Sequence, residues 1–187
     1  VEGRLAAVIC IEDPLREEAA DVLRSLKTLG IRKLVMMTGD SEKTAAAVAQ
    51  QVGVDEYYSE VLPEDKARFV EKEKAKGNVV IMVGDGINDS PALSAADVGI
   101  AISDGAEIAR ENADITIESD SLKGLLTLRI LSSLLMKRIQ KNYRMIVGIN
   151  GGLIAGGVTG LIPPTVSAWL HNGLTLAITL KSMKNLL

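Results

Sequence analysis

Acidic, amide and glycine residues are concentrated in residues 83–93, which read VGDGINDSPAL in one-letter code. The apolar run 79–82 precedes them, so a buried strand is expected to deliver Asp85 to the carboxyl end of a sheet, where open α/β folds bind ligands. Asp85 and Asp89 are hard oxygen donors of the kind that Mg²⁺ takes together with phosphate and water. A polar turn with Asp89 as a helix N-cap is the simpler alternative. The density of acids, amide and glycines favours a site for magnesium and a phosphoryl group.

A second strand-like run, residues 33–37, leads into Thr38, Gly39 and Asp40. The hydroxyl and backbone amide of Thr38 could hold a phosphoryl oxygen at the carboxyl end of that strand. Thr-Gly-Asp is also good turn chemistry, so the triplet alone is a weak signal.

Two further segments place charge at the start of a helical pattern. Lys66 follows Pro63 in the segment LPEDK, where its ammonium could neutralise charge on an acyl phosphate. A solvated surface lysine is the alternative. Asp13 and Arg16 belong to the segment DPLR, whose other interpretation is an N-cap with proline at the first helical position.

In the order DPLR, TGD, PEDK and GDGINDSPAL, these segments resemble the phosphorylation domain of P-type ATPases, which belong to the haloacid dehalogenase-like superfamily. The resemblance covers nearly the whole chain. It implies that Thr38 and Lys66 contact an aspartyl phosphate and that Asp85 binds Mg²⁺. It also implies that Asn88 and Asp89 complete the phosphate and magnesium surroundings, Asp89 as a further magnesium ligand.

The same resemblance implies a nucleotide-related role for three other residues. Asp40, Asp13 and Arg16 match positions near the hinge to the nucleotide-binding domain. The implied cofactors are Mg²⁺ and ATP, the latter bound mainly by that other domain, and the TGD glycine Gly39 counts with the catalytic residues.

The nucleophile of the family lies in an Asp-Lys-Thr-Gly-Thr segment, which these 187 residues do not contain. We therefore expect a C-terminal part of a longer pump, inactive alone, with the remaining domains of the same pump as its partners. The alternative is a stand-alone, membrane-anchored module that binds magnesium and phosphate without catalysis. A soluble phosphatase would need an Asp-x-Asp nucleophile and no lipid-like tail, and the sequence meets neither condition.

Apolar runs alternate with helical patterns over the first two thirds of the chain. This alternation predicts an α/β fold with a Rossmann-like, haloacid dehalogenase-type parallel sheet, followed by a long helix and a transmembrane helical hairpin. The expected strands are 5–11, 34–37, 79–83, 98–102 and 114–117, and the expected helices are 15–29, 41–52, 63–77 and 89–96. Cys10 is the one cysteine, so no disulfide framework is expected.

Charge divides the chain into two environments. Residues 1–120 hold all 24 acidic and 13 of the 21 basic residues, a net charge of −11, whereas 121–187 hold eight basic residues and no acidic one, a net charge of +8. An acidic part that meets Mg²⁺ and a basic part that meets lipid would have this pattern. Basic residues without stacking aromatics argue against nucleic acid as a partner.

Two uncharged stretches in the basic part suggest a membrane hairpin. Residues 145–162 and 166–180 lack charge, and about 20 apolar residues span a bilayer. Glycines recur every fourth residue from Gly148 to Gly160, a stripe that lets another helix pack closely in lipid. We expect an integral protein of the plasma membrane, with residues 1–120 as part of the phosphorylation domain, 121–144 as a connecting helix and 1–144 in the cytoplasm. A buried helical pair in a soluble protein is the alternative.

Polar residues inside such spans often mark a transport path. His171 is the one histidine and the first candidate ligand, because imidazole suits divalent transition metals, and Asn150 and Thr175 are further candidates. An interfacial histidine near Trp169 is the alternative. Two spans after the phosphorylation domain resemble the heavy-metal (P1B) branch. Residues 169–175 resemble its His-Glu-Gly-x-Thr pattern more than the copper pattern, which implies ATP-driven transport of a divalent transition-metal ion rather than Cu⁺.

Overall fold

The computed structural model describes residues 15–84, 88–102, 112–117 and 121–184 of the chain. It forms two compact units, which divide after Leu126. The predicted strand 5–11 lies outside the described residues, and so do Asp13 and Asp85.

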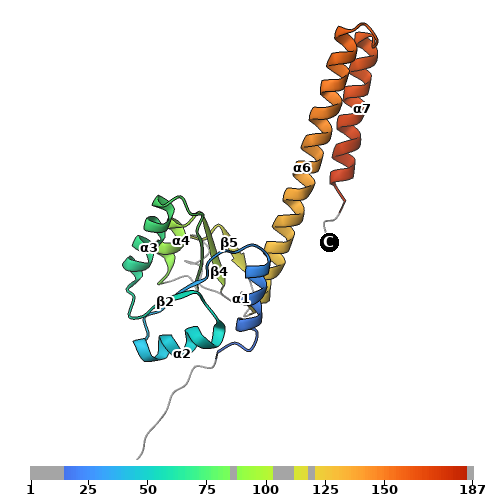
Figure 1. The fold of residues 1–187 in the computed structure, drawn as a ribbon. Coiled ribbons are helices and arrows are strands. Elements are labelled where there is room, and N and C mark those ends of the chain that lie inside the picture. Colours follow the sequence, from blue (N-terminus) through green and yellow to red (C-terminus); the bar gives the residue numbers. More distant parts are fainter. Residues whose placement is uncertain (1–14, 85–87, 103–111, 118–120, 185–187) are drawn as a thin grey trace, which may run out of the picture. The chain divides into compact units, whose positions relative to one another are not determined.

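The described part of the first unit contains two parallel sheets (Figure 1). One pairs β1 with β2, and the other has the order β3, β4, β5. The strands are β1 (Val35–Met37), β2 (Glu56–Tyr58), β3 (Ile81–Gly84), β4 (Val98–Ile102) and β5 (Ile115–Ile117). The predicted parallel α/β architecture is confirmed. The strand β2 was not predicted, because its sequence Glu-Tyr-Tyr is exposed throughout and has no apolar run.

The register of the strands aligns their carboxyl ends. Met37 lies opposite Tyr58 in the first sheet, and Gly84 lies opposite Ala101 in the second. Beyond Met37, the amide of Thr38 still donates to the carbonyl of Tyr58 at 3.0 Å, which continues the ladder into the TGD segment. The segment with predicted phosphate chemistry therefore starts at a fixed strand end.

In the described ranges four helices accompany these strands. Proline at the first turn favours the start of α3, and Gly53, with φ of 74°, ends α2 in the left-handed conformation that glycine adopts readily. The helices are α1 (Ala19–Thr28), α2 (Glu42–Val52), α3 (Pro63–Ala75) and α4 (Ser90–Ala95). Each lies within its predicted range. The helix α1 is shorter than the predicted range 15–29 at both ends because the residues there form turns, and helix ends are the least certain part of a sequence pattern.

The core of this unit joins α3 and α4 to β3. Val70, Met82, Ala92 and Leu93 are each at most 9% exposed and form one cluster. Fully burying a Val or Leu side chain contributes about 1.5–3 kcal/mol. Gly99 of β4 permits close packing here, because a Cβ on it would lie 2.6 Å from the carbonyl oxygen of Leu93. These contacts fix the start of both helices relative to the end of β3.

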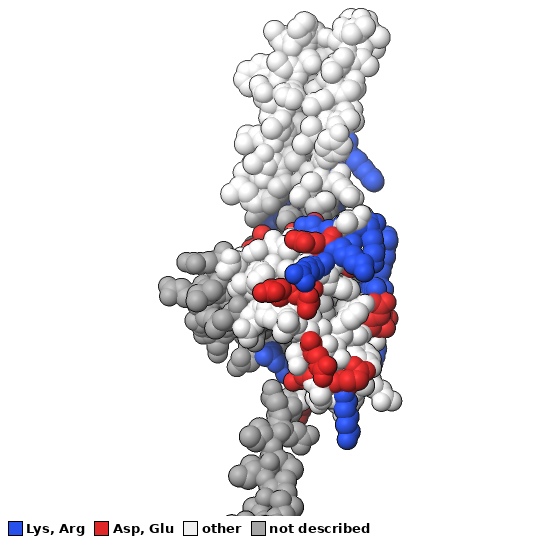
Figure 2. Space-filling view, turned by 90° about the vertical axis from the view of Figure 1, so that its left-hand side faces the viewer, with Lys and Arg blue, Asp and Glu red and all other residues white. Residues whose placement is uncertain are grey.

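Acidic and basic side chains are interspersed on the face of the first unit that Figure 2 shows. The ion pairs of this unit include local ones, such as Arg24 with Asp21 at 2.9 Å and Arg68 with Asp65 at 3.2 Å. Within each of these pairs the opposite charges compensate each other locally.

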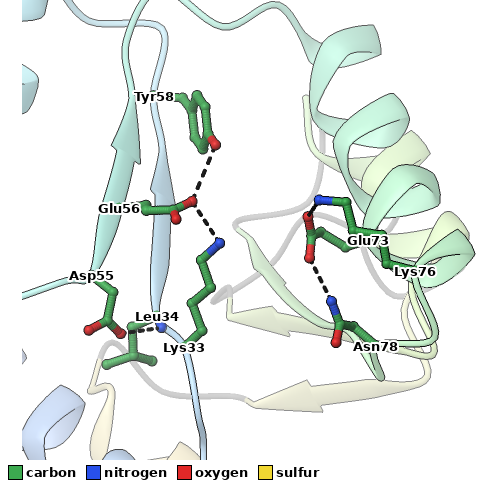
Figure 3. A network of polar contacts seen from close by, with 8 residues as sticks. All are labelled: Lys33, Leu34, Asp55, Glu56, Tyr58, Glu73, Lys76 and Asn78. Carbon is green, nitrogen blue, oxygen red and sulfur yellow. Dashed lines mark hydrogen bonds and ion pairs between the residues drawn. The ribbon is translucent and has the colours of Figure 1, made fainter.

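Polar contacts tie the amino ends of β1 and β2 together (Figure 3). Asp55 accepts the backbone amide of Leu34 at 2.8 Å, and Lys27 Nζ lies 2.5 Å from its other oxygen. The hydrogen bond from Lys27, then that from Leu34, lower the pKa of Asp55. Lys33 Nζ contacts Glu56 at 2.7 Å, and this hydrogen bond is the main cause of the lowered pKa of Glu56.

We expect these carboxylates to make unfolding of the chain pH-dependent. Their folded pKa values lie below the ordinary values of 3.8 for Asp and 4.5 for Glu, so their stabilisation is present above pH 4.5 and lost as pH falls through the folded values. Denaturant unfolding followed from about pH 7 to about pH 3 measures this. Asp55→Asn should lower stability at pH 7 and flatten the acid limb. Glu71→Gln on α3 is the control, and equal curves for both variants would contradict the assignment.

The second unit is built from two helices that run side by side in Figure 1. They are α6 (Lys123–Val158), whose first residues belong to the first unit, and α7 (Pro164–Ser182). Gly160, with φ of 73°, lies in the turn between them, and Pro164 starts α7. The predicted connecting helix 121–144 and most of the first uncharged stretch form one continuous helix, α6.

No helix in the described ranges is long and apolar enough to cross a membrane, so the predicted spans are not confirmed. The physical reason lies in the helix ends and in composition. The helix α6 stops at Val158, so the end of the uncharged stretch 145–162 falls in the turn. The helix α7 includes His171 and Asn172 within its apolar sequence.

The predicted glycine stripe does not pack against α7. A Cβ on Gly148 or Gly152 would meet no described atom within 4 Å. At Gly156 it would lie 2.5 Å from Cδ1 of Ile162, a side chain of the following turn. The helical pair thus leaves most of this stripe open.

Candidate functional site

A partly buried ion pair lies where β3 meets α3 and α4. Lys66 Nζ contacts Asp89 Oδ1 at 2.7 Å, and the two side chains are only 14% and 12% exposed. Lys66 is in the first turn of α3, and Asp89 is the N-cap residue of α4. Low exposure strengthens the attraction between the charges and makes an unpaired charge costly. Lys66 is therefore a fixed cation rather than a solvated surface lysine.

The position of Asp89 depends on Gly84, the last residue of β3. A Cβ on Gly84 would lie 2.5 Å from Asp89 Oδ2 and 2.7 Å from Asp89 Cβ. Distances this short are closer than non-bonded carbon and oxygen atoms approach, so only glycine leaves room for the aspartate. Gly84 thus leaves room for a carboxylate of the chain itself.

The TGD segment forms a compact turn after β1. Thr38 Oγ1 donates to Asp40 Oδ2 at 2.7 Å, and the amide of Asp40 donates back to Thr38 Oγ1 at 3.1 Å. The carbonyl of Thr38 accepts the amide of Val61 at 2.9 Å. A Cβ on Gly39 would have only the Val61 oxygen nearby, at 3.9 Å. The segment therefore forms a turn, and the hydroxyl of Thr38 stays near the surface.

Core packing brings the TGD turn and the ion pair into one neighbourhood. Met37 directly precedes Thr38, and Ala67 directly follows Lys66. Both Met37 and Ala67 pack against the cluster of Val70, Met82, Ala92 and Leu93. The chain neighbours of Thr38 and Lys66 thus pack against the same core as α4, the helix that begins after Asp89.

The remaining predicted residues of this site are less constrained. Asn88 is exposed in the turn before α4, and Arg16 is exposed in the segment before α1. Arg16 lines a shallow cavity of about 210 Å³ together with Glu17 and Gln51, rather than the TGD turn. Asp13 and Asp85 lie outside the described residues.

The chemistry of Asp89 fits a magnesium ion with few protein ligands. Within the described ranges no group of three or more His, Cys, Asp or Glu could hold a metal. Mg²⁺ is usually held by one or two carboxylates together with water and substrate phosphate. Asp89 Oδ1 takes the Lys66 ammonium, while Oδ2 lies at the end of β3 beside Gly84. Asp89 could therefore supply one of the carboxylate ligands that such a site uses.

The second unit brings together the three candidates for a transported metal. His171 Nδ1 and Asn150 Oδ1, on different helices, lie 2.8 Å apart. Thr175 Oγ1 donates to the backbone carbonyl of His171 at 2.9 Å, one turn further along α7. Its hydroxyl proton is therefore engaged by the helix, while the imidazole and amide meet between the helices.

Comparison with known proteins agrees with the fold. The family described as haloacid dehalogenase-like hydrolase matches residues 1–97, and a second family of the same description matches residues 67–128. The chain belongs to the haloacid dehalogenase-like hydrolases.

Within that class the similarity is to metal-transporting ATPases. The chain is 42% identical over 185 residues, 98% of its length, to a manganese-exporting P-type ATPase of Mycobacterium leprae (strain TN) and to a zinc-exporting P-type ATPase of Mycobacterium marinum (strain ATCC BAA-535 / M). The crystal structure of a zinc-transporting PIB-type ATPase in the E2.Pi state superposes with a TM-score of 0.83 at 34% identity, over 90% of this chain and 27% of that one.

These matches confirm the resemblance to P-type ATPases of the heavy-metal branch. The catalytic CPx-ATPase domain CopB-B also matches, with a TM-score of 0.55 at 40% identity over 61% of this chain and 45% of that one. The chain spans about a quarter of the length of the curated relatives, 26% and 25% of the two mycobacterial proteins.

Proposed function

We propose that the chain is part of an ATP-driven transition-metal transporter that forms an aspartyl-phosphate intermediate. The observation that carries this proposal is the Lys66–Asp89 pair, at 2.7 Å and largely buried beside the end of β3. Its support comes from the similarity to manganese- and zinc-exporting P-type ATPases over 98% of the chain. On this proposal the phosphorylated aspartate and the nucleotide-binding domain belong to other parts of the same protein.

The residues of the first unit would act on the phosphoryl group through charge and position. Lys66 would neutralise charge on the phosphoryl oxygens as the bond to the aspartate forms and breaks. Asp89 would orient that ammonium and, with Asp85, hold Mg²⁺, which supplies positive charge against the phosphate when bound. The Thr38 hydroxyl would turn from Asp40 to a phosphoryl oxygen, and Asn88 would donate from the neighbouring turn.

Asp40, Asp13 and Arg16 would act at the hinge to the nucleotide-binding domain, and ATP would be held mainly by that domain. Support for this role comes from the family resemblance of the TGD and DPLR segments. The exposure of Asp40 and Arg16 leaves both side chains accessible to another domain.

The helical unit would associate with the lipid bilayer through its uncharged surface. Large apolar side chains are widely exposed there, among them Val158 at 84%, Leu161 at 81% and Trp169 at 81%. Apolar surface of this extent on a soluble monomer is unusual and indicates a membrane or partner contact. We place residues 1–144 in the cytoplasm and the helical hairpin at the plasma membrane, with its open glycine stripe packed against other helices of the same protein.

The transported ion would be a divalent transition metal that approaches His171 and Asn150. Imidazole and amide groups suit such ions better than they suit Cu⁺, which prefers thiolate and thioether ligands. The 2.8 Å contact between the two side chains would open to admit the ion.

Phosphoenzyme formation in the full-length protein tests this function. Radiolabelled ATP should phosphorylate it when Mg²⁺ and a divalent transition metal such as Zn²⁺ or Mn²⁺ are present, and chelation of either metal should abolish the label. The 187 residues alone should incorporate none, because they lack the nucleophile. A full-length protein without label would favour a non-catalytic module that binds magnesium and phosphate. Stimulation by Cu⁺ alone would contradict the proposed metal class.

A further inference from the structure

A cavity of about 370 Å³ lies between α6 and the C-terminal end of α7. This volume falls within the range of about 300–1,000 Å³ that small-ligand sites occupy. Its charged lining is entirely basic: Lys137, Arg138, Lys141, Lys181 and Lys184. All of these residues belong to the second unit, so the cavity does not depend on how the two units are placed.

Two polar side chains build the wall of this cavity. Arg138 donates to the backbone carbonyl of Ser182 at 3.1 Å and also to that of Lys184. Asn142 Nδ2 donates to Ser182 Oγ at 2.7 Å. A guanidinium on the last carbonyls of a helix satisfies acceptors that have no partner within the helix. Arg138 and Asn142 therefore hold α6 and α7 together, and the lysines supply the remaining positive charge.

The lysines of the cavity repel one another, and none of them forms an ion pair with an acidic side chain of the described residues. Lys137 and Lys141 are four residues apart, so they lie on one face of α6, where like charges are unfavourable. No described ion pair involves Lys137, Lys141, Lys181 or Lys184. Residues 121–187 contain no aspartate or glutamate. A ligand must therefore bring the negative charge that this cavity favours.

The surface next to the cavity indicates which anion fits. After Arg144 on α6 and before Lys181 on α7 the helices carry no charge. Large apolar side chains there are exposed, as at Val147 (52%), Ile154 (67%) and Leu176 (61%). Figure 2 shows the uncharged surface over most of the helical unit. A ligand with a negative head and an apolar tail would satisfy the cavity and this surface at the same time.

We propose that this cavity, here called the lysine pocket, binds the phosphate headgroup of an anionic phospholipid. The proposal rests on the membrane hairpin of the proposed function. Positive charge at the boundary of apolar helices attracts anionic lipid, and basic pockets between helices on the cytoplasmic side hold such headgroups. The bound phosphate would bridge Lys137 and Lys141 of α6 to Lys181 and Lys184 at the end of α7, and so fasten the two helices together.

Native mass spectrometry of the full-length protein in detergent tests the lysine pocket. The probes are dioleoyl-phosphatidylglycerol and dioleoyl-phosphatidylcholine, and the measured quantity is the lipid-bound fraction as a function of lipid concentration. The wild type should retain phosphatidylglycerol in preference to phosphatidylcholine. Two lysines near a membrane surface predict that the double variant Lys137→Gln/Lys141→Gln binds phosphatidylglycerol about thirtyfold more weakly.

Arg144→Gln is the matched control for Lys141→Gln. Both remove one charge from the same helix, but Arg144 does not line the cavity. Only Lys141→Gln should weaken retention, and equal losses would show diffuse attraction and overturn the pocket. Equal binding of both lipids would also overturn the proposed lipid site. Displacement of phosphatidylglycerol by millimolar inorganic phosphate would show that the lysine pocket binds free phosphate rather than a lipid headgroup. Phosphoenzyme formation, measured in the same preparations, tests the proposed function separately, because neither lysine belongs to the phosphate site.

Discussion

Lys66→Met should reduce phosphoenzyme formation in the full-length protein by about a hundredfold or more. The side chain is a fixed cation, 2.7 Å from Asp89 Oδ1 and 14% exposed, so no other group can take its place without rearrangement. Removal of one preorganised group that stabilises developing charge typically costs 10²–10³ in rate. The initial rate of label transfer from ATP, at saturating Mg²⁺ and transported metal, measures the effect.

Loss of folding must be separated from loss of chemistry in this experiment. Lys66→Met leaves the Asp89 carboxylate without its partner, which should cost about 1–3 kcal/mol of stability. The double variant Lys66→Met/Asp89→Asn removes the unpaired charge, so it should regain stability but not phosphorylation. Lys72→Met, on the same helix and outside the site, should leave both unchanged. A Lys66→Met protein that phosphorylates at the wild-type rate would refute the role given to this lysine.

The helices and most strands of the first unit were predictable because their signals are local. Proline at position 63, where α3 begins, and the apolar run of β4 each indicate one conformation. The strand β2 has no such signal, since Glu56, Tyr57 and Tyr58 are held by pairing with β1 rather than by burial of their side chains. The conformation of β2 is therefore determined by its pairing with β1 rather than by its local sequence.

For the candidate site too, the sequence predicted which residues have suitable chemistry but not which of them are in contact. The sequence predicted chemistry at Thr38, Lys66 and Asp89, and the structure adds that Lys66 and Asp89 pair directly while Thr38 contacts Asp40. Of the lysine pocket, the sequence showed only the net charge of +8 over residues 121–187, to which Lys137 and Lys141 of α6 contribute. Lys181 and Lys184 lie more than 30 residues further along the chain, and only the turn between α6 and α7 brings them to those two lysines.

Gly84→Ala should abolish most activity although alanine adds a single methyl group. The new Cβ would lie 2.5 Å from Asp89 Oδ2, 2.7 Å from Asp89 Cβ and 2.9 Å from Asp89 Cγ. Rotation of the carboxylate alone relieves only part of this clash, because the Asp89 Cβ is fixed to the backbone at the start of α4. The helix start or the strand end must shift, and that shift pulls Asp89 away from Lys66. We expect phosphoenzyme formation to fall at least tenfold, with a stability loss of about 1–3 kcal/mol.

Gly124→Ala provides the control that separates crowding from site geometry. A Cβ at Gly124 would lie 2.6 Å from Ile117 Cγ2, also in the first unit but at β5 rather than beside the ion pair. Both variants should unfold at lower denaturant concentration, whereas only Gly84→Ala should lose phosphorylation beyond its loss of folded protein. If both variants lost phosphorylation only as far as they lost folded protein, Gly84 would matter for packing alone. Because the clash involves the side chain that holds Lys66, we expect the activities to differ at equal folded fraction.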